Sequence, residues 1–366
     1  MGDKVTVHLT VLAAVMIAAI NTIACHGRSK SNGVIEKTLV VVDSLGVEYG
    51  VENQVYGDIA AAMQINDTTI VILDKGYQEL RIYDHNGSYL YTKNYNGNGP
   101  YEYQCAANLA LRANGIGVFE SIRPPKFIEM DMMLEPENAV TIGESRTLNE
   151  PWYVNSETIA GYIRYYTMVN DIPTMGIEIC TWNAATGERL ETIYERGQEL
   201  LSLDNGYGLF VDMEACVAAS SNGRVYVAEN KEANEVTVYS LDGNAIDTLR
   251  IENEAGFRTP EEVEQELIWR KLRDGDLGDW NPNNESLGVI DIQIQDSLGY
   301  VWICSGSYCQ PYFTVYNMNG DIEFTCVCEG LPSNELMGFG ITDSGYLAYT
   351  ISPVTYPRVY LLEMEQ

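Results

Sequence analysis

The chain has 366 residues, of which 52 are acidic and 22 are basic, so its formal net charge is −30. A chain this acidic is repelled by the phosphate backbone of nucleic acids and by an anionic lipid leaflet, which excludes most functions that depend on either surface. Hydrophobic residues (46%) and charged residues (20%) have the proportions of a globular protein, while 32 glycines and 25 tyrosines favour strands and turns. We therefore expect an all-β protein.

The N-terminal segment has the features of an export signal. Lys4 precedes an apolar run, Leu9–Ile20, that is shorter than the roughly 20 residues needed to cross a bilayer. The run is followed by Ala24 and Cys25, which resemble a bacterial lipobox, although Thr22 stands where leucine is usual. The sequence predicts a lipoprotein signal peptide at residues 1–24, and the alternative is an ordinary secretory signal with an incidental cysteine.

These features predict an address in the cell envelope. Cys25 would carry the lipid, and the polar residues that follow it would form a flexible tether at 25–37. We expect the protein to be anchored at the outer membrane or the periplasmic face and to contact the membrane through its lipid alone. We also expect a monomer.

From about residue 55 onward, the chain repeats a pattern of apolar alternating runs joined by tight Asx/Gly turns. In the clearest copy, Thr69–Tyr95, the turn is Asp84-His85-Asn86-Gly87. Two further clear copies turn at Leu241-Asp242-Gly243 and at Met318-Asn319-Gly320. The six copies, three of them fainter, are Thr69–Tyr95, Gly117–Ile142, Ile177–Tyr194, Arg224–Ile251, Tyr300–Cys328 and Tyr346–Met364.

Small antiparallel units of this kind are stabilised by radial packing into a β-propeller. The copies recur every 47 residues or so, roughly the spacing of known propeller repeats. The sequence therefore predicts one six-bladed β-propeller over residues 38–366. Because the last copy stops after its third strand, we expect the isolated run at residues 38–43 to supply the missing outer strand of the last blade, and its removal would expose a sheet edge.

One helical insertion is expected between the fourth and fifth copies, at residues 259–279. Thr259-Pro260-Glu261-Glu262 has the pattern of an N-cap, an N1 proline and a capping-box glutamate, and Asp274-Gly275 is typical of a helix end. We expect a helix at about 260–273 lying across the propeller, with Glu266 and Arg270 paired on its surface. The apolar stripe expected to be buried is Val263, Leu267, Ile268 and Leu272.

A short motif follows the first copy, in the run NYNGNGPYEY at residues 94–103. With the upstream VEYGVENQVYG, it resembles the six-bladed β-propeller lipoproteins of Bacteroidetes and related bacteria, relatives of NHL and TolB-like propellers. The resemblance implies a propeller fold and an envelope location, and it does not imply a particular reaction. The matching residues, for which we expect a structural role in a turn between blades, are Gly97, Gly99, Pro100, Glu102 and Tyr103.

The sequence contains no complete catalytic or metal-binding motif, and we expect no cofactor and no metal. The glycines at 97–100 lack the lysine and Ser/Thr of a phosphate-binding loop. With only His26 and His85 outside the predicted signal peptide, a Ser-His-Asp triad is nearly excluded. A calcium loop formed by Asp274, Asp276 and Asp279 is an alternative to a solvated acidic turn, but the spacing does not fit an EF-hand.

Seven cysteines lie beyond Cys25. An odd number cannot all pair within one chain, and small buried hydrophobic residues are the main interpretation for most of them. A disulfide between Cys304 and Cys309 is the alternative that the spacing leaves open.

An aromatic cluster around Trp152 is the candidate ligand-binding feature. Aromatic side chains on a propeller face can hold sugars or peptides, and the alternative is packing between blades. The cluster also contains Tyr162, and the candidate residues within it are Trp152, Tyr153, Tyr165 and Tyr166. The sequence thus favours a non-catalytic binding or scaffold propeller that holds a protein, peptide or glycan, with a cationic or neutral ligand preferred. The alternative function is a hydrolase or lyase that uses carboxylates, with or without calcium, in the central channel.

Overall fold

The structure is a computed structural model of the chain. It describes residues 34–51, 54–121, 124–143, 148–169, 172–199, 214–251, 257–274, 281–352 and 355–365. Residues 36–366 form one compact unit, and the following description concerns that unit alone. The predicted signal peptide and Cys25 lie outside the described residues.

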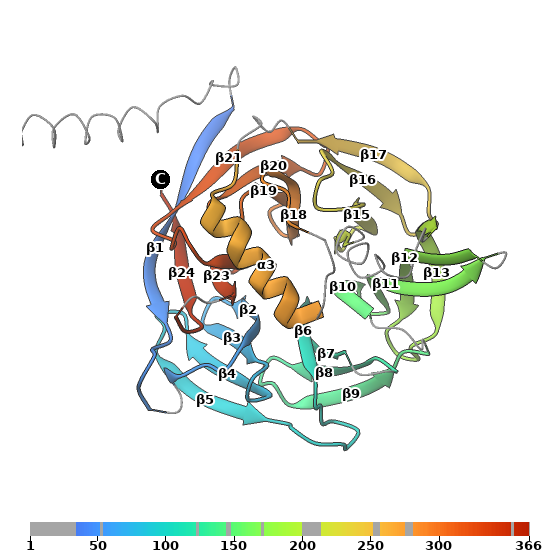
Figure 1. Cartoon of the computed structure of the whole chain (residues 1–366). Coiled ribbons are helices and arrows are strands. Elements are labelled where there is room, and N and C mark those ends of the chain that lie inside the picture. Colours follow the sequence, from blue (N-terminus) through green and yellow to red (C-terminus); the bar gives the residue numbers. More distant parts are fainter. Residues whose placement is uncertain are drawn as a thin grey trace, which may run out of the picture. The chain divides into compact units, whose positions relative to one another are not determined.

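The unit is built from antiparallel sheets arranged radially in the manner of a propeller (Figure 1). Four of the sheets have four strands each, in chain order. The first two are β2 (Ile59–Asn66), β3 (Thr69–Asp74), β4 (Glu79–Asp84) and β5 (Tyr89–Asn94), then β6 (Ala106–Arg112), β7 (Gly115–Glu120), β8 (Lys126–Asp131) and β9 (Pro136–Thr141). The next two are β10 (Leu148–Asn155), β11 (Thr158–Val169), β12 (Ile172–Asn183) and β13 (Arg189–Glu199), then β14 (Cys216–Ala219), β15 (Arg224–Ala228), β16 (Glu235–Ser240) and β17 (Ala245–Arg250).

The remaining strands pair into one sheet of eight, in the order β18-β19-β20-β21-β1-β24-β23-β22. Its strands are β18 (Leu287–Gln295), β19 (Tyr300–Gly306), β20 (Pro311–Asn317), β21 (Ile322–Glu329), β1 (Ile35–Leu45), β24 (Val359–Met364), β23 (Gly345–Ser352) and β22 (Leu336–Thr342). The six separate sheets expected from the repeat are therefore not observed in the described residues. The reason is that β1 hydrogen-bonds on one side to β24 and on the other to β21.

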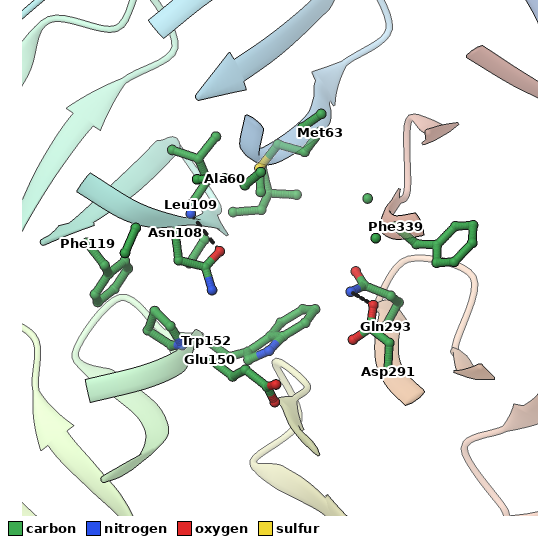
Figure 2. A pocket seen from close by; sticks show the side chains of 18 of the residues that line it. Ala60, Met63, Asn108, Leu109, Phe119, Glu150, Trp152, Asp291, Gln293 and Phe339 are labelled. Atoms are coloured by element: carbon green, nitrogen blue, oxygen red, sulfur yellow. Dashed lines mark hydrogen bonds between the residues drawn. The ribbon is translucent and has the colours of Figure 1, made fainter. Parts of the chain in front are cut away.

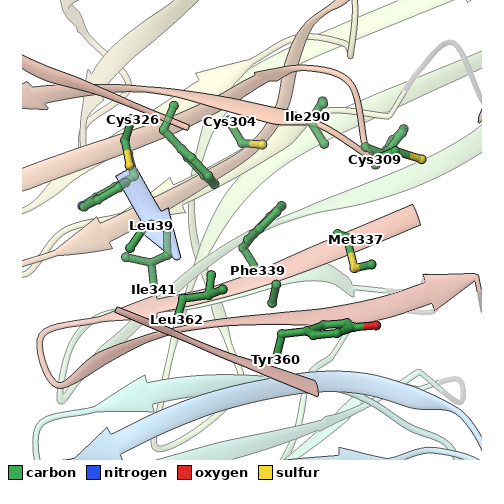
Figure 3. Packing of buried hydrophobic residues seen from close by; sticks show 14 of the residues in the cluster. Leu39, Ile290, Cys304, Cys309, Cys326, Met337, Phe339, Ile341, Tyr360 and Leu362 are labelled. Atoms are coloured by element: carbon green, nitrogen blue, oxygen red, sulfur yellow. The ribbon is translucent and has the colours of Figure 1, made fainter. Parts of the chain in front are cut away.

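The predicted closure by the N-terminal run is confirmed. β1 runs antiparallel to β24, from the pair Leu39 and Met364 to the pair Leu45 and Val359. Leu39 is fully buried among side chains from strands on both sides of β1 (Figure 3). A segment near the start of the unit thus completes the sheet that contains the last strand of the chain.

The hairpin turns follow the sequence pattern. In the turn after β4, Asp84 Oδ1 accepts hydrogen bonds from the amides of Asn86 (2.9 Å) and Ser88 (2.8 Å), while Gly87 has a φ of +82°. Glycine takes this left-handed conformation without the steric cost that a side chain brings. The turn after β20 repeats the arrangement, with Asn317 as the acceptor and Gly320 at a φ of +84°. The predicted Asx/Gly turns are therefore confirmed.

Helix α3 (Pro260–Asp274) lies across one face of the ring of sheets (Figure 1). Its position and its end agree with the sequence prediction, and the Thr259 hydroxyl caps it by accepting a hydrogen bond from the amide of Glu262 (3.2 Å). Glu262 does not close a capping box, because its carboxylate binds Arg258 and the amide of Tyr308 instead.

Candidate functional site

A cavity of about 1350 Å³ lies at the centre of the ring of sheets. Its wall is formed by the first strand of each four-stranded sheet, by β18 and β22, and by α3. The strands follow one another around the cavity in the order β2, β6, β10, β14, β18 and β22, and β22 contacts β2 again. The closed ring of inner strands makes this cavity the place where side chains from the whole chain converge.

Helix α3 is held over the cavity by buried ion pairs. Arg258 contacts Glu262 (2.9 Å) and Glu266 (2.6 Å), and Arg270 contacts Glu266 (3.1 Å) and Glu214 (2.5 Å). All five side chains are almost fully buried. The pair Glu266–Arg270, which the sequence placed on the helix surface, is therefore internal, because Glu214 and Arg258 supply partners that make its burial tolerable.

The apolar side of α3 faces the opposite way from the expectation. Ile268 and Leu272 are 42% and 82% exposed, and both line the cavity together with Trp269. Two residues of the predicted stripe, Ile268 and Leu272, therefore give the cavity an apolar side, while Val263 and Leu267 are half-buried and do not line it. Other apolar side chains of the wall are Met63, Leu109, Phe119, Trp152 and Phe339.

Glu150 occupies an unusual position in this wall. It has a φ of +43°, which is rare for a residue other than glycine, and it lies where the pairing of β10 with β11 is irregular, between Asn149 and Trp152. Its Oε2 accepts a hydrogen bond from the amide of Val217 (2.8 Å). Burial, opposed by Lys231 and reinforced by Asp291, raises the pKa of Glu150 to about 7.

Asp291 and Lys231 face the same space. Asp291 accepts hydrogen bonds from Gln293 Nε2 (2.8 Å) and from the amide of Ile292 (2.8 Å), and burial raises its pKa. Lys231 Nζ lies 2.9 Å from Cys216 Sγ and also contacts the Ile290 carbonyl. Figure 2 shows the side chains of Glu150 and Asp291 directed into the cavity from separate strands.

Two tyrosines add polar groups to the wall. Tyr162 and Tyr308 are each only 4% exposed, and both line the cavity. Within the described ranges, neither hydroxyl has a hydrogen-bond partner in the protein. Both hydroxyls are therefore available to a bound molecule or to water.

The predicted aromatic cluster is divided by the structure. Trp152 and Tyr153 line the cavity, and the Tyr153 hydroxyl donates to Glu129 (3.2 Å). Tyr165 and Tyr166 do not line it: the Tyr165 hydroxyl donates to Glu195 (3.0 Å), and Tyr166 is 49% exposed. The four residues therefore do not form one surface.

The glycine-rich motif lies away from the cavity, in a tight turn after β5. The Gly99 amide donates to Glu102 Oε2 (2.7 Å), and a Cβ on Gly97 would lie 2.0 Å from the same oxygen. The amide of Gly97 donates to the Tyr103 carbonyl (3.1 Å), and Tyr103 is fully buried. Pro100 is exposed at the turn. These contacts are the ones that a closed turn requires.

All seven cysteines beyond Cys25 are free thiols, so the alternative disulfide between Cys304 and Cys309 does not form. The carboxylates of the alternative calcium loop, including Asp276 and Asp279, lie outside the described side chains. Among the described residues, no helix is long and apolar enough to span a bilayer.

Sequence reasoning missed Glu150, Lys231, Asp291 and Tyr308 as members of a site, whereas Tyr162 belongs to the aromatic cluster that the sequence singled out. They come from segments scattered between β10 and the loop after β19, and no motif links them. The signal available in the sequence was weak: Glu150 precedes Pro151, a residue that interrupts regular strands.

Comparison with known proteins gives similarity at the level of fold. No family model and no curated protein matches the sequence. A Bacteroides thetaiotaomicron protein of unknown function aligns over 90% of this chain and 75% of its own, with 10% identity and a TM-score of 0.49. A Bacteroides fragilis protein thought to be exported aligns over 91% of this chain and 99% of its own, with 9% identity and a TM-score of 0.46.

Proposed function

We propose that the protein is a ligand-binding propeller of the cell envelope, and that the ligand enters the central cavity. The observation that carries this proposal is the composition of the cavity wall. Apolar side chains of α3 and of the inner strands share it with seven acidic and five basic side chains and with the buried tyrosines Tyr162 and Tyr308. Ligand pockets typically combine an apolar lining with a few polar groups that orient the ligand.

The charge of the chain favours a cationic or neutral ligand, such as a peptide segment or a short glycan, over an anion. A net charge of −30 repels anions at long range, and its effect is screened by salt beyond about 8–10 Å. The fold supports binding without setting the chemistry, since propellers commonly present a concave central face.

The test is a ligand screen with a variant whose cavity is partly filled. Ala60 of β2 lines the cavity, and Ala60→Phe would occupy part of it. Lysine-containing tripeptides, triglycine and short glycans are screened against the full chain by thermal shift and tryptophan fluorescence. The proposal expects at least one compound to raise the Tm of the wild type and of the exposed-site control Ala245→Phe, with the effect lost in Ala60→Phe. Equal responses in all three proteins, or none, would contradict it.

We also infer that the eight-stranded sheet represents two blades, β18–β21 and β22–β24 with β1, which gives six blades in total. The six inner strands around the cavity support this count. With the motif at Gly97–Tyr103, it supports membership of the six-bladed lipoprotein propellers. We further propose a lipid anchor at Cys25 and a monomeric protein.

One observation favours the second candidate, a hydrolase or lyase. Glu150 has a carboxyl group whose pKa is raised to about 7, and it shares the cavity wall with a second carboxyl group, Asp291, a combination found at acid–base catalytic sites. This candidate predicts turnover of nitrophenyl glycosides that Glu150→Gln reduces by at least a hundredfold. Unchanged turnover in the variant, or no turnover in the wild type, would reject it.

A further inference from the structure

We propose that the ligand of the central cavity carries an ammonium group, which Glu150 and Asp291 bind together, and an apolar stem, which lies against Trp152 and α3. This inference rests on the proposed binding function and adds the chemical class of the ligand. The class is an organic amine, either a free amine or the lysine side chain of a peptide.

The two carboxyl groups are placed for a shared cation. Glu150 lies on β10 and Asp291 on β18, the inner strands on either side of β14. Asp291 contributes to the raised pKa of Glu150, and Lys231 acts on both carboxyl groups. Two carboxylates that disfavour each other's charge are both stabilised when a cation binds between them.

Both groups keep acceptor capacity for a ligand. Glu150 uses one oxygen for the Val217 amide, and Asp291 accepts one hydrogen bond at each oxygen. A carboxylate has about four acceptor positions, so each group can accept further donors from an ammonium. The hydroxyls of Tyr162 and Tyr308, buried in the same wall without protein partners, are additional acceptors.

Lys231 is the protein cation that could take the place of a ligand ammonium beside Glu150 and Asp291. Its own ammonium group already contacts Cys216 Sγ and the Ile290 carbonyl. Glu214 is compensated by Arg270 and Arg273, and Arg164 lies 3.9 Å from it. With all groups ionised, the cavity wall has seven acidic and five basic side chains, and this excess of two negative charges favours a bound cation.

The apolar part of the ligand has a matching wall. The indole of Trp152 extends into the space next to Glu150 (Figure 2), and an ammonium near its face is attracted by a cation–π interaction. Ile268 and Leu272 expose their side chains along the cavity side of α3. Burial of an apolar stem against these residues is favourable because it removes their surfaces from water.

Binding of an amine is expected to release a proton. The charged groups that act on Glu150 are Lys231, Asp291 and Glu214. The uncharged titratable groups coupled to it are Tyr162, Tyr349 and Cys216. Burial raises the pKa of Glu150 to about 7, so near pH 6 the free protein holds a proton there. A bound ammonium lowers this pKa and expels the proton. Affinity should therefore rise about fivefold between about pH 6 and pH 7.

The experiment is isothermal titration of the full chain with phenethylamine and with phenethyl alcohol, its neutral counterpart of similar shape. Titrations near pH 6 in two buffers of different ionisation enthalpy measure the proton released. N-acetyl-lysine methylamide, titrated in parallel, represents a lysine of a peptide and distinguishes that source from a free amine. We expect the better of the two amines to bind at least tenfold more tightly than phenethyl alcohol and to release a proton.

Two variants locate the effect. Glu150→Gln retains an oxygen that can accept from the Val217 amide, and Asp291→Asn removes the second charge. Glu157→Gln makes the same charge change at an exposed turn residue and serves as the control. We expect each cavity variant, if folded by its thermal transition, to lose at least tenfold in amine affinity, and Glu150→Gln to lose the proton release. The control should match the wild type.

The outcomes separate the two proposals. If phenethyl alcohol binds as tightly as both amines, or if a glycan of the screen binds and neither amine does, the amine inference is overturned while the binding function stands. If no compound binds in the cavity by either method, both fail. Amine binding that is unchanged in both folded cavity variants also overturns the inference.

Discussion

Arg270 of α3 and Glu214, two residues before β14, form an ion pair with an Nη1–Oε2 distance of 2.5 Å, and both side chains are buried. Burial raises the pKa of Glu214, but Arg270, the neighbour that lowers it most, acts with Arg273, Lys231 and Arg164 to hold it well below its ordinary value. The pair joins the helix to the inner rim of the sheet ring. It therefore fixes one side of the cavity to another part of the chain that is 56 residues away.

We predict that Arg270→Met lowers the free energy of unfolding by ~3–5 kcal/mol, because it leaves Glu214 and Glu266 buried without their shared partner. Chemical denaturation measures the effect. Lys271→Met, at the exposed neighbouring position on the same helix, is the control and should change stability by less than about 0.5 kcal/mol. A loss below about 1 kcal/mol in Arg270→Met would show that α3 is held mainly by other contacts.

The closure by β1 gives a second prediction. Leu39 is fully buried, whereas Val42 on the same strand is 49% exposed. Leu39→Ala should cost ~2–5 kcal/mol, because it removes core contacts and leaves a cavity. Val42→Ala should cost much less. Equal losses in the two variants, measured by denaturant unfolding, would mean that β1 does not contribute to the core.

Much of the fold was predictable because the repeated copies contain strong hairpin signals. Each clear copy corresponds to the second, third and fourth strands of a sheet, as Thr69–Tyr95 does for β3 to β5. The inner strands were missed. β14 has only four residues, and β10 is interrupted by Pro151, so neither shows a regular alternation. Residues of the candidate site lie largely on these inner strands or beside them.

The helix shows a different limit of sequence reasoning. Its bounds follow from local capping signals, which the sequence contains in full. Its orientation depends on Glu214 and Arg258, which provide buried partners for Glu266 and Arg270 from outside the helix. The spacing of apolar residues within a helix contains no information about partners outside it. It therefore predicted that Ile268 and Leu272 would be buried.

The lipid anchor remains a prediction from the sequence. Cys25→Ser should abolish incorporation of labelled fatty acid and release the protein from the membrane fraction, because the membrane affinity is attributed to the lipid alone. The control is Cys105→Ser, which removes an exposed thiol and should retain both properties. Absence of label in the wild-type protein would leave an ordinary secretory signal as the interpretation.

Glu150 should make stability depend on pH in the direction opposite to that of a salt-bridged carboxylate. Burial raises its pKa from an ordinary value of 4.5 to about 7, so between these values the native state holds a proton that the unfolded state releases. The free energy of unfolding should therefore fall as pH rises through this window, by up to ~3 kcal/mol.

Glu150→Gln removes this ionisation and keeps an acceptor for the Val217 amide. We predict that the variant is more stable than the wild type at about pH 8, by up to ~3 kcal/mol. At about pH 4.5 and below, the two proteins should be nearly equally stable, because Glu150 becomes protonated in both the native and the unfolded wild type. Thermal and denaturant unfolding across this range, with Glu157→Gln as the exposed control, measure the difference. If the free energy of unfolding of the wild type instead rises relative to that of the variant as pH rises, the charged form of Glu150 is stabilised in the native protein, as a cation already bound beside it would do.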